Sequence, residues 1–252
     1  MIARRPMLIA ALSGALSLML GGAALAGETK VAVAANFTDA AREIAARFKA
    51  RTGHDATLSF GSSGQFYTQI ANGAPFEVFL SADVERPRKA EAEGLAVPGS
   101  RFTYATGRLV LYSKTPGLVD GKGKVLTTGK FEKLSIADPK AAPYGQAAVE
   151  TLTKLNLYDA LKPKIVQGAS ITQAFQYVQT GAAELGFVAL SQVVGEQGGS
   201  RWVVPASNHT PIEQQAVLLK TGQNSEAAKA FVTFLKSGEA KAIIKRYGYE
   251  VR

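Results

Sequence analysis

Two adjacent serines between glycines, Gly61-Ser62-Ser63-Gly64, lie where an apolar stretch passes into a helical pattern. Ser62 and Gln65 have the spacing of a capping box, in which each side chain satisfies the other residue's backbone N–H. The following N–H groups and the Ser63 hydroxyl would stay free at the positive end of a helix dipole, and the two glycines would let a ligand approach the backbone. Such a turn can bind an anion, although a serine at a helix start is more often only a cap.

The same strand-to-helix turn recurs at three other places. Asn36, Tyr144 and Ile171 each follow a strand-like segment and begin a helical pattern, and Ser170 with Gln173 repeats the capping spacing. Ligands of open α/β sheets bind at the carboxyl ends of the strands, where all these turns lie. If two domains turn these edges toward each other, four helix N-termini converge on one cleft.

Such a cleft would offer neutral donors only, namely backbone N–H groups, short polar side chains and a phenol. A small, fully deprotonated oxyanion fits it, because its oxygens only accept hydrogen bonds. A protonated anion would leave a donor unmatched, at a cost of about 1–3 kcal/mol. Each residue also has a simpler explanation: Asn36 as a helix cap, Tyr144 as a surface phenol, and Ile171 as a core residue that contributes only its N–H.

The sequence contains few of the patterns that are typical of enzyme active sites. The chain has no cysteine, no HExxH pattern and no GxxxxGK[ST] loop, so thiolate chemistry and these metal and nucleotide sites are excluded. The serine pair lacks the glycine spacing of a nucleophile elbow. His54 and His209 lie in polar loop contexts without an evident acidic partner. A secreted serine hydrolase that uses Ser62 or Ser63 remains a remote alternative, and we expect a protein that is not an enzyme.

The first 26 residues have the pattern of a cleavable signal peptide: a basic start, an apolar run from Met7 to Ala26 and a small-x-small ending. The chain contains no second apolar run long enough to cross a bilayer. The formal net charge is +9, or +7 without the two arginines of the leader. The basic residues are scattered rather than clustered, which argues against a nucleic-acid partner and is consistent with steering of an anionic ligand.

Strand-like and helical segments alternate along the mature chain, which predicts parallel sheets with helices on both faces. The segments form two series and therefore two domains. The predicted division is a first domain of residues 27–107 plus 217–252 and a second of residues 108–216. No flexible linker separates the two series, so we expect two shared strands, Tyr104 to Tyr112 and Ile212 to Lys220, to cross between the domains.

Several longer motifs together resemble the periplasmic molybdate-binding proteins of ABC importers. They are VAVAANFTDAAREIAARF, SFGSSGQFYTQIANGAPFEVFLSAD, IADPKAAPYG, and AELGFVAL with the closing IIKRYGY. The resemblance implies an α/β, two-domain periplasmic binding protein fold of type II, in which two crossing strands join mixed, mostly parallel sheets flanked by helices. It also implies a periplasmic monomer that binds molybdate or tungstate, without a cofactor or a directly bound metal, and delivers it to a permease with a cytoplasmic ATPase.

By position, the resemblance assigns the ligand contacts to Asn36, Ser63, Tyr144 and Ile171. Additional backbone or cap contacts are expected from Ala35, Ser62 and Ser170. Many members have a tyrosine where this chain has Ala189, so we expect the Tyr144 hydroxyl to replace the missing phenol, with Gly145 leaving room for its ring. The alternative within binding proteins is a receptor for sulfate or another tetrahedral oxyanion.

Overall fold

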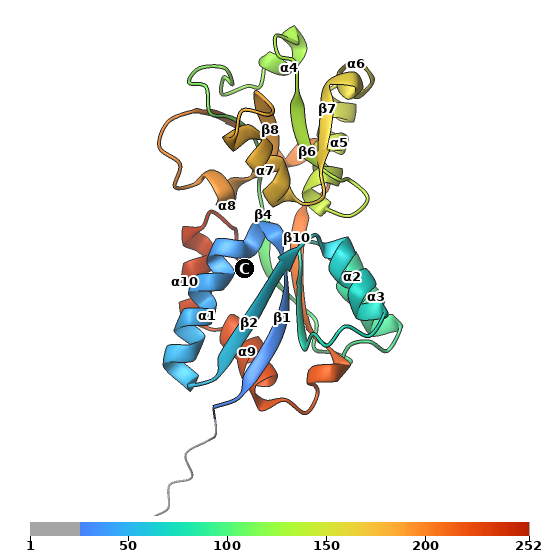
Figure 1. The fold of residues 1–252 in the computed structure, drawn as a ribbon, viewed down its shortest axis with the longest axis vertical. Coiled ribbons are helices and arrows are strands. Elements are labelled where there is room, and N and C mark those ends of the chain that lie inside the picture. The colour runs from blue at the N-terminus through green and yellow to red at the C-terminus, as the bar shows by residue number, and fades with distance from the viewer. Residues whose placement is uncertain (1–25, 252) are drawn as a thin grey trace, which may run out of the picture.

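The computed structural model describes residues 26–251 of the chain. The predicted leader, residues 1–26, lies outside the described residues apart from Ala26. Figure 1 shows two α/β domains stacked along the long axis, with the labels of β4 and β10 close to their junction. Among the helices of the described part, none is long and apolar enough to span a bilayer.

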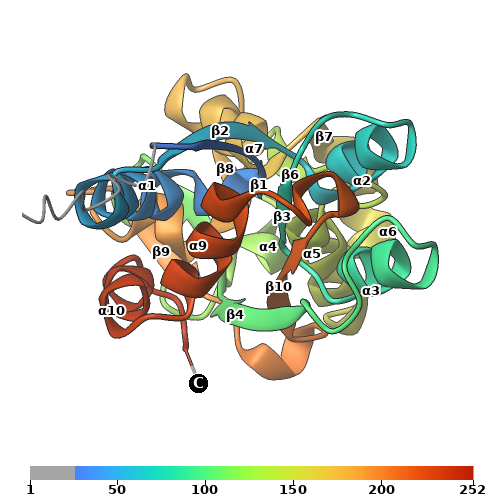
Figure 2. The same ribbon diagram turned by 90° about the horizontal axis from the view of Figure 1, so that it is seen from below.

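The first domain contains a five-stranded sheet of order β2-β1-β3-β10-β4. β1 pairs in parallel with β2 and β3, whereas β10 runs antiparallel to β3 and β4. Figure 2 shows α1, α9 and α10 on one face of this sheet and α2 and α3 on the other. The bounds are β1 Glu28–Ala34, α1 Thr38–Thr52, β2 Asp55–Gly61, α2 Ser63–Ala71, β3 Val78–Ser81, α3 Glu85–Ala92, β4 Phe102–Gly107, β10 Ile212–Leu218, α9 Glu226–Leu235 and α10 Gly238–Arg246.

The second domain repeats this arrangement in a five-stranded sheet of order β7-β6-β8-β5-β9. β6 is parallel to β7 and β8, and β5 is antiparallel to β8 and β9. Both sheets are therefore mixed, as expected, with two parallel and two antiparallel strand pairings in each. The bounds are β5 Leu109–Ser113, α4 Val125–Thr128, β6 Leu134–Ala137, α5 Pro143–Lys154, α6 Tyr158–Leu161, β7 Ile165–Gly168, α7 Ile171–Gln179, β8 Leu185–Ala189, α8 Leu190–Val193 and β9 Ser200–Val203.

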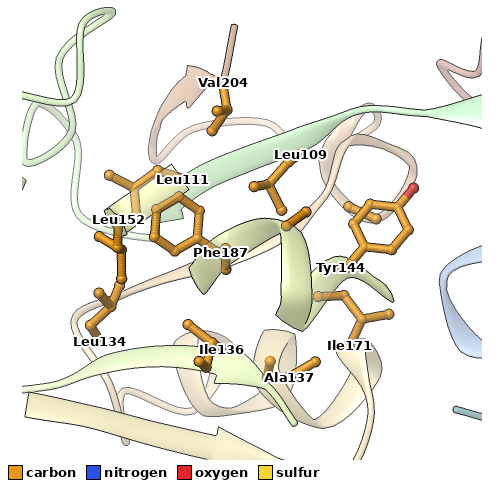
Figure 3. Close-up of a cluster of buried hydrophobic side chains, with 14 of the residues drawn as sticks. Leu109, Leu111, Leu134, Ile136, Ala137, Tyr144, Leu152, Ile171, Phe187 and Val204 are labelled. Atoms are coloured by element: carbon orange, nitrogen blue, oxygen red, sulfur yellow. The ribbon is translucent and has the colours of Figure 1, made fainter. Parts of the chain in front are cut away.

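Apolar helix faces attach the helices to the sheets. In α1, Ile44 and Phe48 are one turn apart and fully buried against the first sheet and α9. Each such side chain contributes about 1.5–3 kcal/mol through burial. Figure 3 shows the main cluster of the second domain, with Tyr144 and Ile171 at one end and the Tyr144 hydroxyl directed away from the cluster. This cluster continues into the first domain through Ala34 and other small residues, so the two domains share apolar contacts.

The first crossing between the domains is confirmed. β4 ends at Gly107 in the first sheet and β5 begins at Leu109 in the second, so the stretch from Tyr104 to Tyr112 belongs to both. Only Arg108 separates the two strands. This short connection limits the positions at which the domains can hinge.

The expected second crossing was wrong. β10 starts at Ile212 and pairs with β3 and β4 only, so residues 212–216 belong to the first sheet rather than to the second domain. The chain crosses earlier, between Val204, whose N–H donates to Leu109 O, and Ile212. The strand begins at Ile212, as expected. The sequence pattern did not show which sheet its first residues join, because strand pairing is decided by tertiary packing.

Three short helices were not expected from the sequence, namely α4, α6 and α8. Each has four residues, which is little more than one turn and too short for a 3.6-residue apolar period to appear.

Candidate functional site

A small cavity lies between the two domains, and Asn36, Ser63, Tyr144 and Ile171 all line it. The space between its lining atoms, open solvent at the mouth included, is only about 200 Å³. No lining residue has a charged side chain. The cavity therefore suits a small ligand held by neutral groups.

The turn before α2 has the predicted capping box. Ser62 Oγ accepts from the Gln65 N–H and Gln65 Oε1 accepts from the Ser62 N–H, both at 3.4 Å. Ser63 Oγ accepts a hydrogen bond of 2.9 Å from the Ala82 N–H. Both hydroxyl oxygens thus accept from backbone N–H groups, and each hydroxyl keeps its own hydrogen available to the cavity that both serines line.

The turn after β1 presents Asn36 in a different way from the one expected. Both hydrogens of its side-chain amide are used within the protein: Nδ2 donates to Gln214 Oε1 and to Tyr249 Oη, each at 2.9 Å. The carbonyl of Asn36 accepts from Tyr249 Oη at 2.6 Å. The backbone N–H is therefore the donor that this residue can offer a ligand.

At the start of α5, Pro143 has no N–H and Tyr144 is the next residue. Tyr144 is 2% exposed. Its phenol oxygen accepts from Gln214 Nε2 at 3.3 Å, and the Asn36 side chain lies within hydrogen-bonding reach of it. Tyr144 is therefore part of the boundary between the domains, and the surface-phenol explanation is excluded.

At the start of α7, Ser170 caps the helix by accepting from the Gln173 N–H at 3.4 Å. The Gln173 side chain does not return to Ser170, as a capping box requires, but accepts from the Ala169 N–H at 2.6 Å. Ile171 is 3% exposed and lines the cavity, while Ser170 does not. Ile171 is thus a core residue that also lines the cavity.

The backbone N–H groups of the four turn residues share one property. Among the residues that the structure describes, none of these N–H groups has a hydrogen-bond acceptor in the protein. Buried N–H groups are nearly always paired, so four unpaired ones around a single cavity indicate a ligand with several acceptor oxygens. The helix dipoles at the same ends favour a negative charge on that ligand.

Hydrogen bonds across the cavity rim join the two domains. The Gly64 N–H donates to Ala141 O at 2.9 Å, and Ser191 Oγ donates to Asn36 O at 2.8 Å. A Cβ atom on Gly64 would lie 3.0 Å from the Ala141 Cα and carbonyl oxygen. Gly64 therefore permits the approach of the second domain, not of a ligand as expected.

The role expected for Gly145 was also wrong. A Cβ atom there would lie 2.2 Å from Ala137 O at the end of β6. The glycine thus lets the start of α5 pack on the second sheet, and it does not make room for the Tyr144 ring. Close packing of α5 against the end of β6, rather than the neighbouring phenol, therefore requires a glycine here.

Polar residues behind the cavity form a network that was not predicted from the sequence. Gln214 and Tyr104 are buried, and Tyr104 Oη donates to Gln214 Oε1 at 3.0 Å. Tyr249 Oη lies 3.0 Å from Ser191 Oγ of the second domain. The polar run Glu213-Gln214-Gln215 before the apolar end of this strand was the available signal for this network.

Burial raises the pKa of Tyr104 and Tyr144 well above the ordinary 10.0 and also raises the pKa of Tyr249. The unfolded chain therefore loses these protons near pH 10 while the folded chain keeps them. We expect the free energy of unfolding, measured in urea, to be steady up to about pH 9 and to fall above pH 10 by about 1.4 kcal/mol per pH unit for each phenol.

In Tyr144→Phe, the fall in unfolding free energy above pH 10 should be smaller than in the parent by about 1.4 kcal/mol per pH unit, because one buried phenol is absent. Equal unfolding free energies of the parent at pH 7 and pH 10.5 would contradict the prediction.

The hydrolase alternative has no support in the site. His54 Nδ1 accepts from the Gly27 N–H at 2.9 Å, and His209 Nδ1 lies 2.8 Å from Thr210 O. In the described part of the chain, neither histidine hydrogen bonds to Ser62 or Ser63. Neither histidine is therefore placed to activate a serine nucleophile.

Residues 29–250 match the model of the bacterial extracellular solute-binding protein family. The chain belongs to this family. Because the match covers nearly all of the described residues, both domains of the fold are those of a solute-binding protein. Its members bind solutes outside the cell membrane, which agrees with a ligand cavity between two domains.

Two relatives of this solute-binding protein are similar over almost their full lengths. The molybdate-binding protein ModA of Rhodobacter capsulatus is 58% identical over 246 residues, which cover 97% of each chain. The molybdate-binding protein ModA of Azotobacter vinelandii is 56% identical over 234 residues, which cover 92% of this chain and 93% of the relative.

Solved structures support the fold. The periplasmic molybdate-binding protein of Azotobacter vinelandii superposes with a TM-score of 0.86 and 45% identity, covering 89% of this chain and 99% of that one. The expected two-domain periplasmic binding protein fold is therefore confirmed. The sulfate-binding protein SubI of Mycobacterium tuberculosis H37Rv has a TM-score of 0.74 at 12% identity and covers 89% of this chain and 87% of that one, which shows a shared fold only.

Proposed function

We propose that this solute-binding protein captures molybdate, and also tungstate, in the interdomain cavity and delivers it to an ABC importer. The observation that carries this proposal is the set of four unpaired backbone N–H groups around one uncharged cavity, together with the Ser63 hydroxyl. A tetrahedral dianion has four oxygens that accept such bonds. Each hydrogen bond to a charged oxygen contributes about 1.5–3 kcal/mol.

The lining also favours a fully deprotonated anion. It contains no carboxylate, which would be the natural acceptor for a hydrogen on a protonated phosphate. Binding such an anion would leave its hydroxyl unpaired in a buried site, at a cost of about 1–3 kcal/mol. Neutral donors can still stabilise a dianion, because the fixed N–H dipoles replace the water that the anion loses.

The biological setting follows from the family and the named relatives. We propose that the chain is exported to the periplasm by its signal peptide, works there as a monomer, and meets a permease whose ATPase is cytoplasmic. No cofactor enters this function, and molybdenum is bound as the oxyanion rather than as a metal ion. The protein acts as a receptor and not as an enzyme.

Isothermal titration calorimetry with molybdate, tungstate, sulfate and phosphate tests the proposed ligand. We expect tight binding of molybdate and tungstate and binding of sulfate that is weaker by about 100-fold or more, as the loss of one or two charged hydrogen bonds implies. Sulfate is smaller, so a cavity closed around molybdate would leave some donors out of its reach. Sulfate that binds as tightly as molybdate would reject this function in favour of the sulfate receptor.

A matched pair of serine variants tests whether the heat measured on titration comes from molybdate binding in this cavity. Ser63→Ala removes a lining hydroxyl and should weaken molybdate binding by about 10-fold. Ser113→Ala removes an equally buried hydroxyl that donates to Glu184 O at 2.5 Å outside the cavity lining. It should leave the affinity unchanged.

A further inference from the structure

Gln214 is a fully buried polar residue on β10, at the boundary between the domains. Its Oε1 accepts from Asn36 Nδ2 at 2.9 Å and from Tyr104 Oη at 3.0 Å. Its Nε2 donates to Tyr144 Oη at 3.3 Å. One side-chain amide therefore connects Asn36 and Tyr144, which line the cavity from different domains.

The pairing of β10 with β4 is irregular at this residue. Gln214 faces Ala105 and Gln215 faces Thr103, so Tyr104 is an extra residue on the opposite strand. β-bulges of this kind redirect side chains and are frequent beside binding sites. The irregularity accompanies the Tyr104 to Gln214 hydrogen bond, which holds the amide in place.

The direction of the amide decides what Tyr144 can do. A phenol has one hydrogen to donate, and its oxygen accepts. Because Gln214 presents an N–H to this oxygen, Tyr144 does not need its hydrogen for Gln214. In the part of the chain that the structure describes, no protein acceptor receives that hydrogen, so it is free for an anion in the cavity.

We propose that Gln214 is a positioning residue for the bound anion: it makes Tyr144 a hydrogen-bond donor toward the cavity and holds Asn36 in the conformation that presents its backbone N–H. The inference rests on the proposed function and extends it to a residue that does not itself line the cavity. A glutamine that merely filled space would have no effect on the direction of the Tyr144 hydrogen.

The variant Gln214→Glu distinguishes these roles, because it keeps the shape of the side chain and changes its hydrogen-bonding pattern with pH. A protonated glutamic acid can still donate one hydrogen to Tyr144 Oη. An ionised carboxylate accepts only, so it would take the Tyr144 hydrogen and place a negative charge beside the anion. Burial raises the pKa of a carboxyl group, which brings this change toward neutral pH.

We expect the molybdate Kd of the parent to be nearly constant between pH 6 and pH 8.5. The Kd of Gln214→Glu should lie close to the parent value at the acidic end and rise by about 100-fold or more at the alkaline end, as the loss of one charged hydrogen bond together with charge repulsion implies. The titratable groups facing this position are the phenols of Tyr104, Tyr144 and Tyr249, whose pKa values lie above this range. The carboxylates of Asp39 and Asp83 act on these phenols in parent and variant alike.

Gln215→Glu is the matched control. Gln215 is the next residue and is 7% exposed, but its Oε1 accepts from Arg101 Nη1 at 2.7 Å and its Nε2 donates to Thr103 Oγ1 at 3.0 Å, away from the cavity. The molybdate Kd of Gln215→Glu should equal that of the parent at every pH. Thermal unfolding of each protein establishes that the variants are folded at the pH of the titration.

If Gln214→Glu does not fold, Gln214→Met in a cycle with Tyr144→Phe replaces it. We expect Gln214→Met to weaken binding by about 10-fold in the parent and much less in Tyr144→Phe, because the hydroxyl that it positions is then absent. A Gln214→Glu profile parallel to that of the parent, or equal effects of Gln214→Met in both backgrounds, would overturn the positioning role. A parent that binds no molybdate would instead reject the proposed function.

Discussion

Gly107→Ala is expected to weaken molybdate binding by about 100-fold or more while each domain stays folded. A Cβ atom at this position would lie 2.0 Å from Tyr144 Oη and 2.7 Å from Gln214 Nε2. Overpacking of this kind typically costs about 1–3 kcal/mol, and displacement of the Tyr144 donor adds to that loss.

The substitution should destabilise mainly the closed arrangement of the domains. Gly107 ends β4 in the first domain, whereas Tyr144 belongs to α5 in the second, so moving the domains apart relieves the contact with Tyr144. The contact with Gln214, which is in the first domain, involves only the end of a flexible side chain and is relieved by a shift of its amide. An anion that is gripped by both domains requires closure, and the variant opposes it. The open form of the variant should therefore unfold at nearly the same denaturant concentration as the open parent.

Calorimetry measures the expected loss of molybdate affinity, and small-angle X-ray scattering measures the expected loss of domain closure. The radius of gyration of the parent should decrease when molybdate is added, and that of Gly107→Ala should not change at the same concentration. Gly121→Ala is the matched control, because a Cβ atom at Gly121 meets no atom within 4 Å. Parent-like affinity of Gly107→Ala, with a parent-like decrease in radius, would show that the domains close without this contact.

Tyr144→Phe is expected to weaken molybdate binding by about 10- to 100-fold, which corresponds to one hydrogen bond to a charged oxygen. The phenyl ring keeps its place in the apolar cluster, so the change is confined to the hydroxyl. Tyr112→Phe provides the control, since Tyr112 is an equally buried tyrosine in a separate cluster of the second domain. Parent-like binding by Tyr144→Phe would leave only the backbone N–H of this turn as a contact.

A phenol at position 189 is not expected to restore the lost affinity. Ala189 is fully buried in the same cluster as Tyr144, and its N–H donates to Gln192 Oε1 at 3.0 Å. With the ring at position 144 still present, Ala189→Tyr would overpack the cluster at a cost of about 1–3 kcal/mol. The shared cluster is consistent with one phenol occupying the space that two would need.

The turns of the site were predictable because their signals are local. Ser62 and Gln65 are three residues apart, and the hydrogen bonds between them form within a single helix turn. The capping pattern, the apolar strand before it and the apolar helix face after it all lie in one short segment. The sequence by itself therefore determined the alternation of strands and helices, the two series of elements and the placement of four helix starts at the carboxyl ends of strands.

Local patterns failed where a residue is explained by a distant partner. The spacing of Ser170 and Gln173 predicts the cap but not that Gln173 reaches Ala169 instead. Gly64 and Gly145 were attributed to the ligand and to Tyr144, but the neighbouring backbone of Ala141 and Ala137 requires them. Which backbone lies against a glycine depends on how the sheets and domains pack.

Only the tertiary structure decided how the cavity is supported. The Gln214 amide joins Asn36, 178 positions away, to Tyr144, 70 positions away. These contacts depend on the order of strands in the first sheet, on the irregular pairing at Tyr104 and on the closure of the second domain. Sequence spacing does not specify them, because a side-chain amide has no periodic signal and its partners are chosen by the packing that surrounds it.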